Sequence, residues 1–150
     1  AEEARARQAE LRQRAQDNPD WNGPEWGKAG GTRSTQEQEI LYDHDIASRS
    51  VSQNPEDRAA IQQAVAEGKG VIVACDAGKL WGDKSKEGAG HAVLVTGVEY
   101  AEDGTVAGYV TNDPAKGCGR RVSADTMNAA LDTTQRAVIT SASIWTYPKS

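Results

Sequence analysis

The sequence contains no phenylalanine, no long apolar run and no cluster of basic residues. Aromatic residues make up only 5% of its 150 residues, so the core is left to valine, isoleucine, leucine and alanine with four tryptophans. A membrane span needs about 20 consecutive apolar residues. No run approaches that length, and the first residues are charged, so we expect a soluble chain with no membrane partner and no signal peptide.

A net charge of −5 without a basic cluster argues against nucleic acid as a partner, because phosphate binding needs lysines and arginines on one face. Only two cysteines are present, Cys75 in an apolar run and Cys118 in a glycine-rich stretch, and two do not make a disulfide framework. Cysteine and histidine spacing does not fit a zinc motif. We therefore expect neither a metal nor a cofactor, although His44 with its aspartate neighbours, or His91 with Asp113, would offer ligands. His44 is expected at the surface near a helix end.

The length is that of a single domain, residues 1–150, and the pattern predicts helices first and an antiparallel sheet in the second half, an α+β domain. The first helical pattern, rich in Glu, Gln, Arg and Ala, has little apolar face and is expected to be solvated. Since the sequence begins with Ala1 within this pattern, we expect a fragment of a longer chain. Ser123 is a predicted helix N-cap, and Gly68 a predicted helix end. Predicted helices cover residues 1–17, 34–46, 55–68 and 124–131; predicted strands cover 46–51, 71–75, 90–98, 108–114 and 137–145; and predicted loops cover 17–31, 78–89 and 115–121.

The strands at 90–98 and 108–114 form a predicted hairpin, with Glu102-Asp103-Gly104 as its turn. His91 then lies at the end far from the turn, and the register that a short loop gives places it opposite residues 113–115. Asp113 should lie next to it. A carboxylate beside an imidazole holds one tautomer and stabilises the imidazolium, which is the orienting half of a nucleophile–base–orienter triad.

A simpler interpretation exists for each of these residues. A lone histidine is more often structural than catalytic, and Asn112-Asp113-Pro114 is ordinary turn material after a strand. Three features favour catalysis: Ala89 and Gly90 leave the approach to His91 open, the strand behind it is expected to be rigid, and Asp113 ends the partner strand. Both side chains would then lie at one rim of a sheet, where a base can meet a substrate.

The chain resembles papain-like cysteine peptidases of the bacteriocin-processing, double-glycine-leader type, and more narrowly the related domains of bacterial polymorphic toxins and secreted effectors. The resemblance covers about residues 26–130 and implies a papain-like fold. It rests on Gly90-His91-Ala92-Val93-Leu94-Val95-Thr96-Gly97, on Asp103-Gly104, on Tyr109-Val110-Thr111-Asn112-Asp113-Pro114, and upstream on Gly30-Gly31-Thr32 and Gly70-Val71-Ile72-Val73.

The resemblance implies that His91 is the general base and Asp113 its orienter, serving a cysteine at a helix start. That cysteine and an oxyanion-hole glutamine lie upstream of Gly30 in the family, where this sequence has no cysteine. Three explanations follow, in order of preference: the nucleophile-bearing segment precedes Ala1, the domain is a natural pseudo-enzyme, or Cys75 has taken over. Cys75 should be buried and inert, whereas Cys118 should be exposed and more reactive, although no role is expected for it.

We therefore expect a toxin or effector domain, secreted or delivered into a target cell, that hydrolyses a peptide bond in a target protein. Its partners would be a protein or peptide substrate and an immunity or inhibitor protein. The alternatives are an inactive papain-like protein-binding module, or an acyltransferase or deamidase that uses the same triad. The stretches 78–89 and 21–31 are expected to line the cleft.

Overall fold

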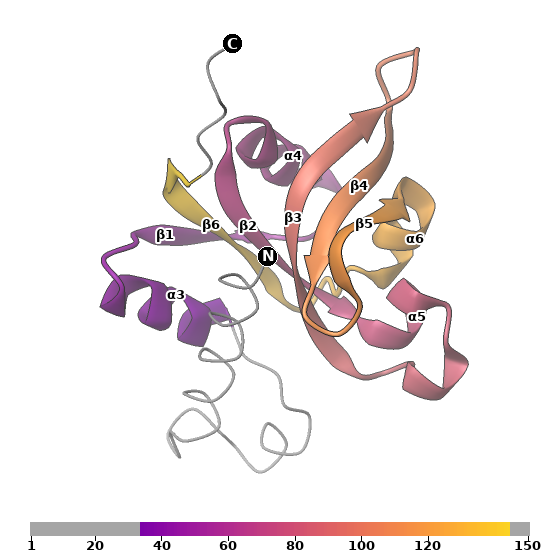
Figure 1. Ribbon diagram of the computed structural model, residues 1–150, viewed down its shortest axis with the longest axis horizontal. Helices are drawn as coiled ribbons and strands as arrows, with labels where there is room; N and C mark the ends of the chain where they lie inside the picture. The colour runs from indigo at the N-terminus through magenta and orange to yellow at the C-terminus, as the bar shows by residue number, and fades with distance from the viewer. Residues whose placement is uncertain (1–33, 145–150) are drawn as a thin grey trace.

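The computed structural model describes residues 34–144, which form a six-stranded antiparallel sheet with helices packed against it (Figure 1). The strand order is β1-β6-β2-β3-β4-β5, and every neighbouring pair is antiparallel. The α+β class with an antiparallel sheet is thereby confirmed. The strands are β1 (Ser48–Ser52), β2 (Lys69–Asp76), β3 (Gly90–Tyr100), β4 (Val106–Asp113), β5 (Gly117–Ser123) and β6 (Arg136–Ser143).

Four α-helices and two short 3-10 helices accompany the described sheet. They are α3 (Ser34–Asp43), η1 (Pro55–Asp57), α4 (Arg58–Ala66), α5 (Ala77–Trp81), η2 (Lys84–Lys86) and α6 (Ala124–Ala130). In Figure 1, α3 lies beside β1, whereas α5 and α6 lie at the other side of the sheet. Between Ser34 and Ile144, none of the helices is long and apolar enough to cross a membrane.

The core lies on the face of the sheet that α4, α5 and α6 cover. Val71, Val73 and Cys75 alternate along β2 with residues that are only partly buried, as expected for a strand with two unlike faces. Ala137 and Ile139 of β6 belong to the same core. The predicted buried central strand is therefore confirmed. The other core members are Ile61, Ala64, Val65, Leu80, Val93, Val95, Tyr109, Val122, Met127, Ala130 and Leu131.

Local signals set several helix ends where the sequence predicts them. Pro55 opens the helical segment, and Gly68, with a φ of 76°, follows its end, because glycine adopts the left-handed region without strain. The Ser123 side chain accepts a hydrogen bond from the Thr126 backbone N–H at the start of α6, which confirms it as the N-cap. The expected extended segment at 46–51 is β1, an edge strand, and the last expected strand is β6.

Two predicted loops are wrong. The segment 78–89 contains most of α5 and all of η2, because the Asp76 side chain caps the first helix and Asp83 caps the second. The segment 115–121 contains most of β5, where the Asn112 side chain accepts a hydrogen bond from the Gly119 N–H, and Gly119 has a φ of 69°. The predicted helix at 1–17 and the loop at 17–31 lie outside the described residues.

The hairpin of β3 and β4 has the predicted register near its open end. Leu94 pairs with Asn112 and Val95 with Thr111, and a bulge then shifts the pairing by one residue at Gly97. The bulge lies between the turn and the open end. His91 lies three residues beyond the last β3–β4 pair, Leu94 with Asn112, on the side of the bulge that keeps the predicted register.

Candidate functional site

His91 and Asp113 meet at the open end of the hairpin, as the sequence predicts. His91 is the second residue of β3, and Asp113 is the last residue of β4. The Nε2 atom of His91 lies 2.8 Å from Oδ1 of Asp113, which is hydrogen-bond distance. His91 is also paired with Cys75 of β2, and from Leu94 onward β3 is paired with β4 on its other side, so the sheet holds the backbone of this strand.

The Asp113 carboxylate is buried and surrounded by donors. Its Oδ1 accepts hydrogen bonds from the backbone N–H of Ala115 at 2.8 Å and of Lys116 at 3.3 Å, in addition to the contact with His91. Burial by itself raises the pKa of this carboxyl, but the hydrogen bonds from His91, Trp81 and Ala115 outweigh it and lower the pKa to about 2. Asp113 is therefore an anion at neutral pH.

An ionised Asp113 determines which imidazole nitrogen is free. A carboxylate only accepts hydrogen bonds, so Nε2 of His91 must carry the proton that lies between them. In the neutral ring, Nδ1 then has the lone pair, and within residues 34–144 it has no hydrogen-bond partner. His91 retains 16% of its side-chain surface exposed, while the Asp113 side chain retains none. The pair thus has the geometry of an accessible base and a shielded orienter.

Trp81, at the end of α5, is the third member of this cluster, and the sequence interpretation missed it. Its Nε1–H donates a hydrogen bond to Oδ2 of Asp113 at 2.8 Å. Its ring meets the His91 imidazole edge-on, with centroids 5.0 Å apart and planes at 64°. The Lys116 ammonium lies 4.6 Å from the Trp81 ring centroid. The sequence does show that Trp81 has an indole N–H, which needs a hydrogen-bond partner when it is partly buried. It does not show which partner, because 32 residues separate Trp81 from Asp113.

The two cysteines differ as expected. Cys75 is 2% exposed, and its Sγ lies 3.6 Å from the backbone oxygen of His91. Burial, with the nearby negative charges of Asp113 and Asp76 adding to it, raises the pKa of the Cys75 thiol to about 12. Cys118 is a free, exposed cysteine on β5. Among the described residues, no hydrogen bond joins either sulfur to the His91 ring.

In the described part of the chain, the other candidate ligands do not gather into a metal site. His44 lies exposed just after α3, on the far side of β6 and β2 from β3. Over residues 34–144, no three side chains of histidine, cysteine, aspartate or glutamate lie close enough to hold a metal ion.

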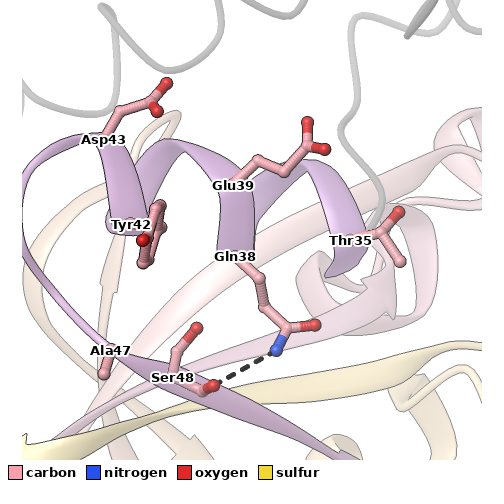
Figure 2. A pocket seen from close by; sticks show the side chains of 7 residues that line it. All are labelled: Thr35, Gln38, Glu39, Tyr42, Asp43, Ala47 and Ser48. Atoms are coloured by element: carbon pink, nitrogen blue, oxygen red, sulfur yellow. Dashed lines mark hydrogen bonds between the residues drawn. The ribbon is translucent and has the colours of Figure 1, made fainter.

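One cavity lies away from the histidine. A groove of about 720 Å³ runs between α3 and the start of β1, where Tyr42 and Asp43 of α3 stand above Ala47 and Ser48 (Figure 2). The Gln38 side chain closes one part of it by donating a hydrogen bond to the Ser48 carbonyl at 3.3 Å. Since β6 and β2 separate β1 from β3, this groove is distant in the sheet from His91.

A smaller hollow of about 350 Å³ lies beside the start of β3, and neither His91 nor Asp113 is among the described residues that line it. Gly90, the neighbour of His91, lines it together with the end of β2 and the segment after α6. Its other lining residues are Cys75, Asp76, Lys79, Gly88, Ala89, Ala129, Ala130, Leu131, Asp132 and Thr133. The segment 78–89, expected to line a cleft, thus contributes to this hollow, whereas the stretch 21–31 lies outside the described residues.

Comparisons with known proteins leave the family open. No protein-family model matches the sequence, and no curated protein matches it either.

Proposed function

We propose that this chain carries the histidine–aspartate half of a papain-like cysteine peptidase site, in a toxin or effector domain that cleaves a peptide bond in a target protein. One observation carries the proposal: a buried, ionised Asp113 holds Nε2 of a partly exposed His91. This arrangement leaves Nδ1 as the basic nitrogen. The resemblance in sequence supports the papain-like fold and the setting in which an immunity protein would be the natural inhibitor.

In the proposed mechanism, Nδ1 of His91 takes the proton of a cysteine thiol, and the thiolate attacks the scissile carbonyl carbon. Asp113 stabilises the resulting imidazolium through Oδ1. His91 then gives the proton to the leaving amine as the tetrahedral intermediate collapses to an acyl-enzyme. Water, deprotonated by the same Nδ1, hydrolyses the thioester and releases the acid product.

The nucleophile is proposed to lie outside these 150 residues. Cys75 is a poor candidate because its thiol is buried and stays protonated at neutral pH. Cys118 is accessible, but among residues 34–144 no hydrogen bond or ion pair joins it to His91. Residues 1–33 and 145–150 contain no cysteine.

The test uses the full-length gene product. Proteolysis of candidate target proteins is compared among the wild type, His91→Ala and His44→Ala, which removes the only other histidine. We expect His91→Ala to lose at least about a hundredfold in kcat, the usual contribution of a general base, and His44→Ala to retain activity. Equal activity in all three would remove His91 from the mechanism.

A second candidate is a papain-like protein-binding module without catalysis, and the lack of a suitably placed cysteine in this sequence favours it. Such a module would bind its target with no covalent step. The full-length sequence of the gene product discriminates the two, because a cysteine at a helix start outside residues 1–150 would favour the enzyme. Acyl transfer or deamidation shares the covalent step, so mass spectrometry of the products would separate them from hydrolysis.

A further inference from the structure

Trp81 contacts both members of the His91–Asp113 pair from a helix outside the hairpin. Its indole N–H reaches Oδ2 of Asp113, and its ring packs edge-on against the imidazole. α5, which carries it, is fixed by the Asp76 cap at its start and by Gly82, with a φ of 69°, at its end. The indole is therefore presented by a short but well-defined element.

The donors around Asp113 are divided unequally between its two oxygens. Oδ1 receives the His91 ring and two backbone N–H groups, whereas Oδ2 has one described partner, the Trp81 indole. A carboxylate can rotate about its Cβ–Cγ bond. Such a rotation would either bring Oδ2 in place of Oδ1 to Nε2 of His91 or change the angle at which Oδ1 meets it. A charge-assisted hydrogen bond in a buried setting is among the stronger ones. The bond to Oδ2 therefore opposes this rotation.

The ring of Trp81 acts on the second partner. Its edge-on packing at 5.0 Å limits the tilt of the imidazole, and Lys116 covers the indole from outside at 4.6 Å. One residue thus restrains both the carboxylate and the ring that the carboxylate orients.

We infer that Trp81 is a positioning residue, which fixes the Asp113 carboxylate so that Oδ1 faces Nε2 of His91 and Nδ1 stays free as the base. The catalytic meaning of this inference rests on the proposed peptidase function. The restraint itself is a property of the folded chain, and it can be measured without any substrate.

The experiment is nitrogen NMR on the 150-residue protein labelled with ¹⁵N-histidine, in which only His44 and His91 give ring signals. Trp81→Phe keeps an aromatic ring but removes the N–H donor. Tyr109→Phe is the matched control, because it removes one hydrogen bond, from Gln62 to the Tyr109 hydroxyl at 3.0 Å, elsewhere in the core. His44, exposed and remote, serves as the internal reference.

In the wild type and in Tyr109→Phe, the neutral His91 ring is expected to carry its proton on Nε2. In Trp81→Phe, the share of this tautomer should fall. When the His91 ring shifts are followed against pH, they show a step at the pH where Asp113 gains its proton. This step should occur about one pH unit higher in Trp81→Phe, because the carboxylate loses a charge-assisted hydrogen-bond donor. Wild-type tautomer and titration in a folded Trp81→Phe protein would overturn the inference.

A second measurement covers the case in which Trp81→Phe does not fold. In Asp113→Asn, the acceptor of the Trp81 indole changes from a carboxylate to a neutral amide, so the indole N–H proton signal, assigned through its contact with His91, should move upfield. An unmoved signal would overturn the inference.

Activity separates this inference from the proposed function. In the full-length gene product, Trp81→Phe should lower the kcat of the proposed proteolysis about tenfold with little change in KM, since it affects the base and not substrate binding. If the NMR changes appear but His91→Ala leaves proteolysis unchanged, the peptidase proposal fails and the positioning role stands. If proteolysis needs His91 but Trp81→Phe changes neither kcat nor the tautomer, the positioning role alone fails.

Discussion

The side chain of Asp113 lies 2.8 Å from Nε2 of His91 and has no exposed surface, while the imidazole that it holds remains partly open. Because these two hydrogen-bonded side chains differ in exposure, they can play different roles. The buried carboxylate can only orient and stabilise, whereas the ring can still meet another group. The same burial ties the charge of Asp113 to the stability of the fold, because its donors are all native contacts.

Asp113 should make stability depend on pH in acid. Its pKa is lowered from 3.8 to about 2 in the folded chain, so the unfolded chain takes up a proton first as the pH falls. The stabilisation is therefore fully present above about pH 4 and is lost as the pH falls through about 2, and it amounts to about 2 kcal/mol.

Urea unfolding of the wild type and Asp113→Asn at a series of pH values checks this. The difference in unfolding free energy between them should shrink as the pH falls from about 5 to about 2. Parallel curves across that range would show that the carboxylate does not carry the expected stabilisation.

The two cysteines should react very differently with iodoacetamide at neutral pH. Cys75 is buried with its thiol pKa raised to about 12, so almost none of it is thiolate, whereas Cys118 is exposed. Mass spectrometry should find one label per native chain, and two after unfolding in urea. Cys118→Ser should abolish labelling of the native protein, and Cys75→Ser should retain it. Rapid native labelling at Cys75 would restore it as a candidate nucleophile.

The hairpin and the Ser123 cap could be predicted from sequence because their causes are local. Strand pairing across a short turn fixes where His91 and Asp113 lie, and Ser123 needs only the N–H three residues on to act as a cap. α5, in contrast, depends on the Asp76 carboxylate, which also accepts a hydrogen bond from the N–H of Gly88, 12 residues away. Such contacts join segments whose separation in sequence gives no signal.

The same limit explains why the sequence interpretation missed Trp81. Its bond to Asp113 exists only because α5 folds back beside the end of β4, and that placement is a tertiary property. Residues 78–89 are predicted as a loop because they are rich in glycine. Gly82, however, is the residue at which the helix α5 ends. Residues at a site are thus found from sequence when one hairpin brings them together, and missed when a distant element supplies them.

Gln53 should be essential for stability although it lies far from the histidine in sequence. It is fully buried, and its amide donates to the carbonyls of Ala74 and Asp132, both at 2.8 Å, and accepts from the Ala74 N–H at 2.9 Å. It thereby links β2 to the segment at Asp132, beyond the last pairs between β2 and β6.

Gln53→Leu keeps the volume but leaves the Ala74 N–H and the Asp132 carbonyl without this partner, so we expect a loss of about 2–5 kcal/mol in unfolding free energy. Gln63→Leu is the matched control, since its amide contacts only the exposed Glu67 side chain, at 3.3 Å, and it should change stability by less than about 0.5 kcal/mol. Equal effects in chemical denaturation would contradict this role of Gln53.

Gly78 should be required for the packing of α5 against the segment that follows it. A Cβ added there would lie 2.1 Å from the Glu87 nitrogen and 2.5 Å from the Glu87 Cα, so backbone would have to move. Gly78→Ala should therefore cost about 1–3 kcal/mol of stability and displace Trp81, which follows three residues later on the same helix. Gly90→Ala is the control, because nothing lies within 4 Å of its added Cβ. In tryptophan-labelled NMR spectra, the Trp81 indole signal should shift in Gly78→Ala and stay close to its wild-type position in Gly90→Ala. An unshifted signal with unchanged stability in Gly78→Ala would mean that the chain relieves the contact without moving the helix that carries Trp81.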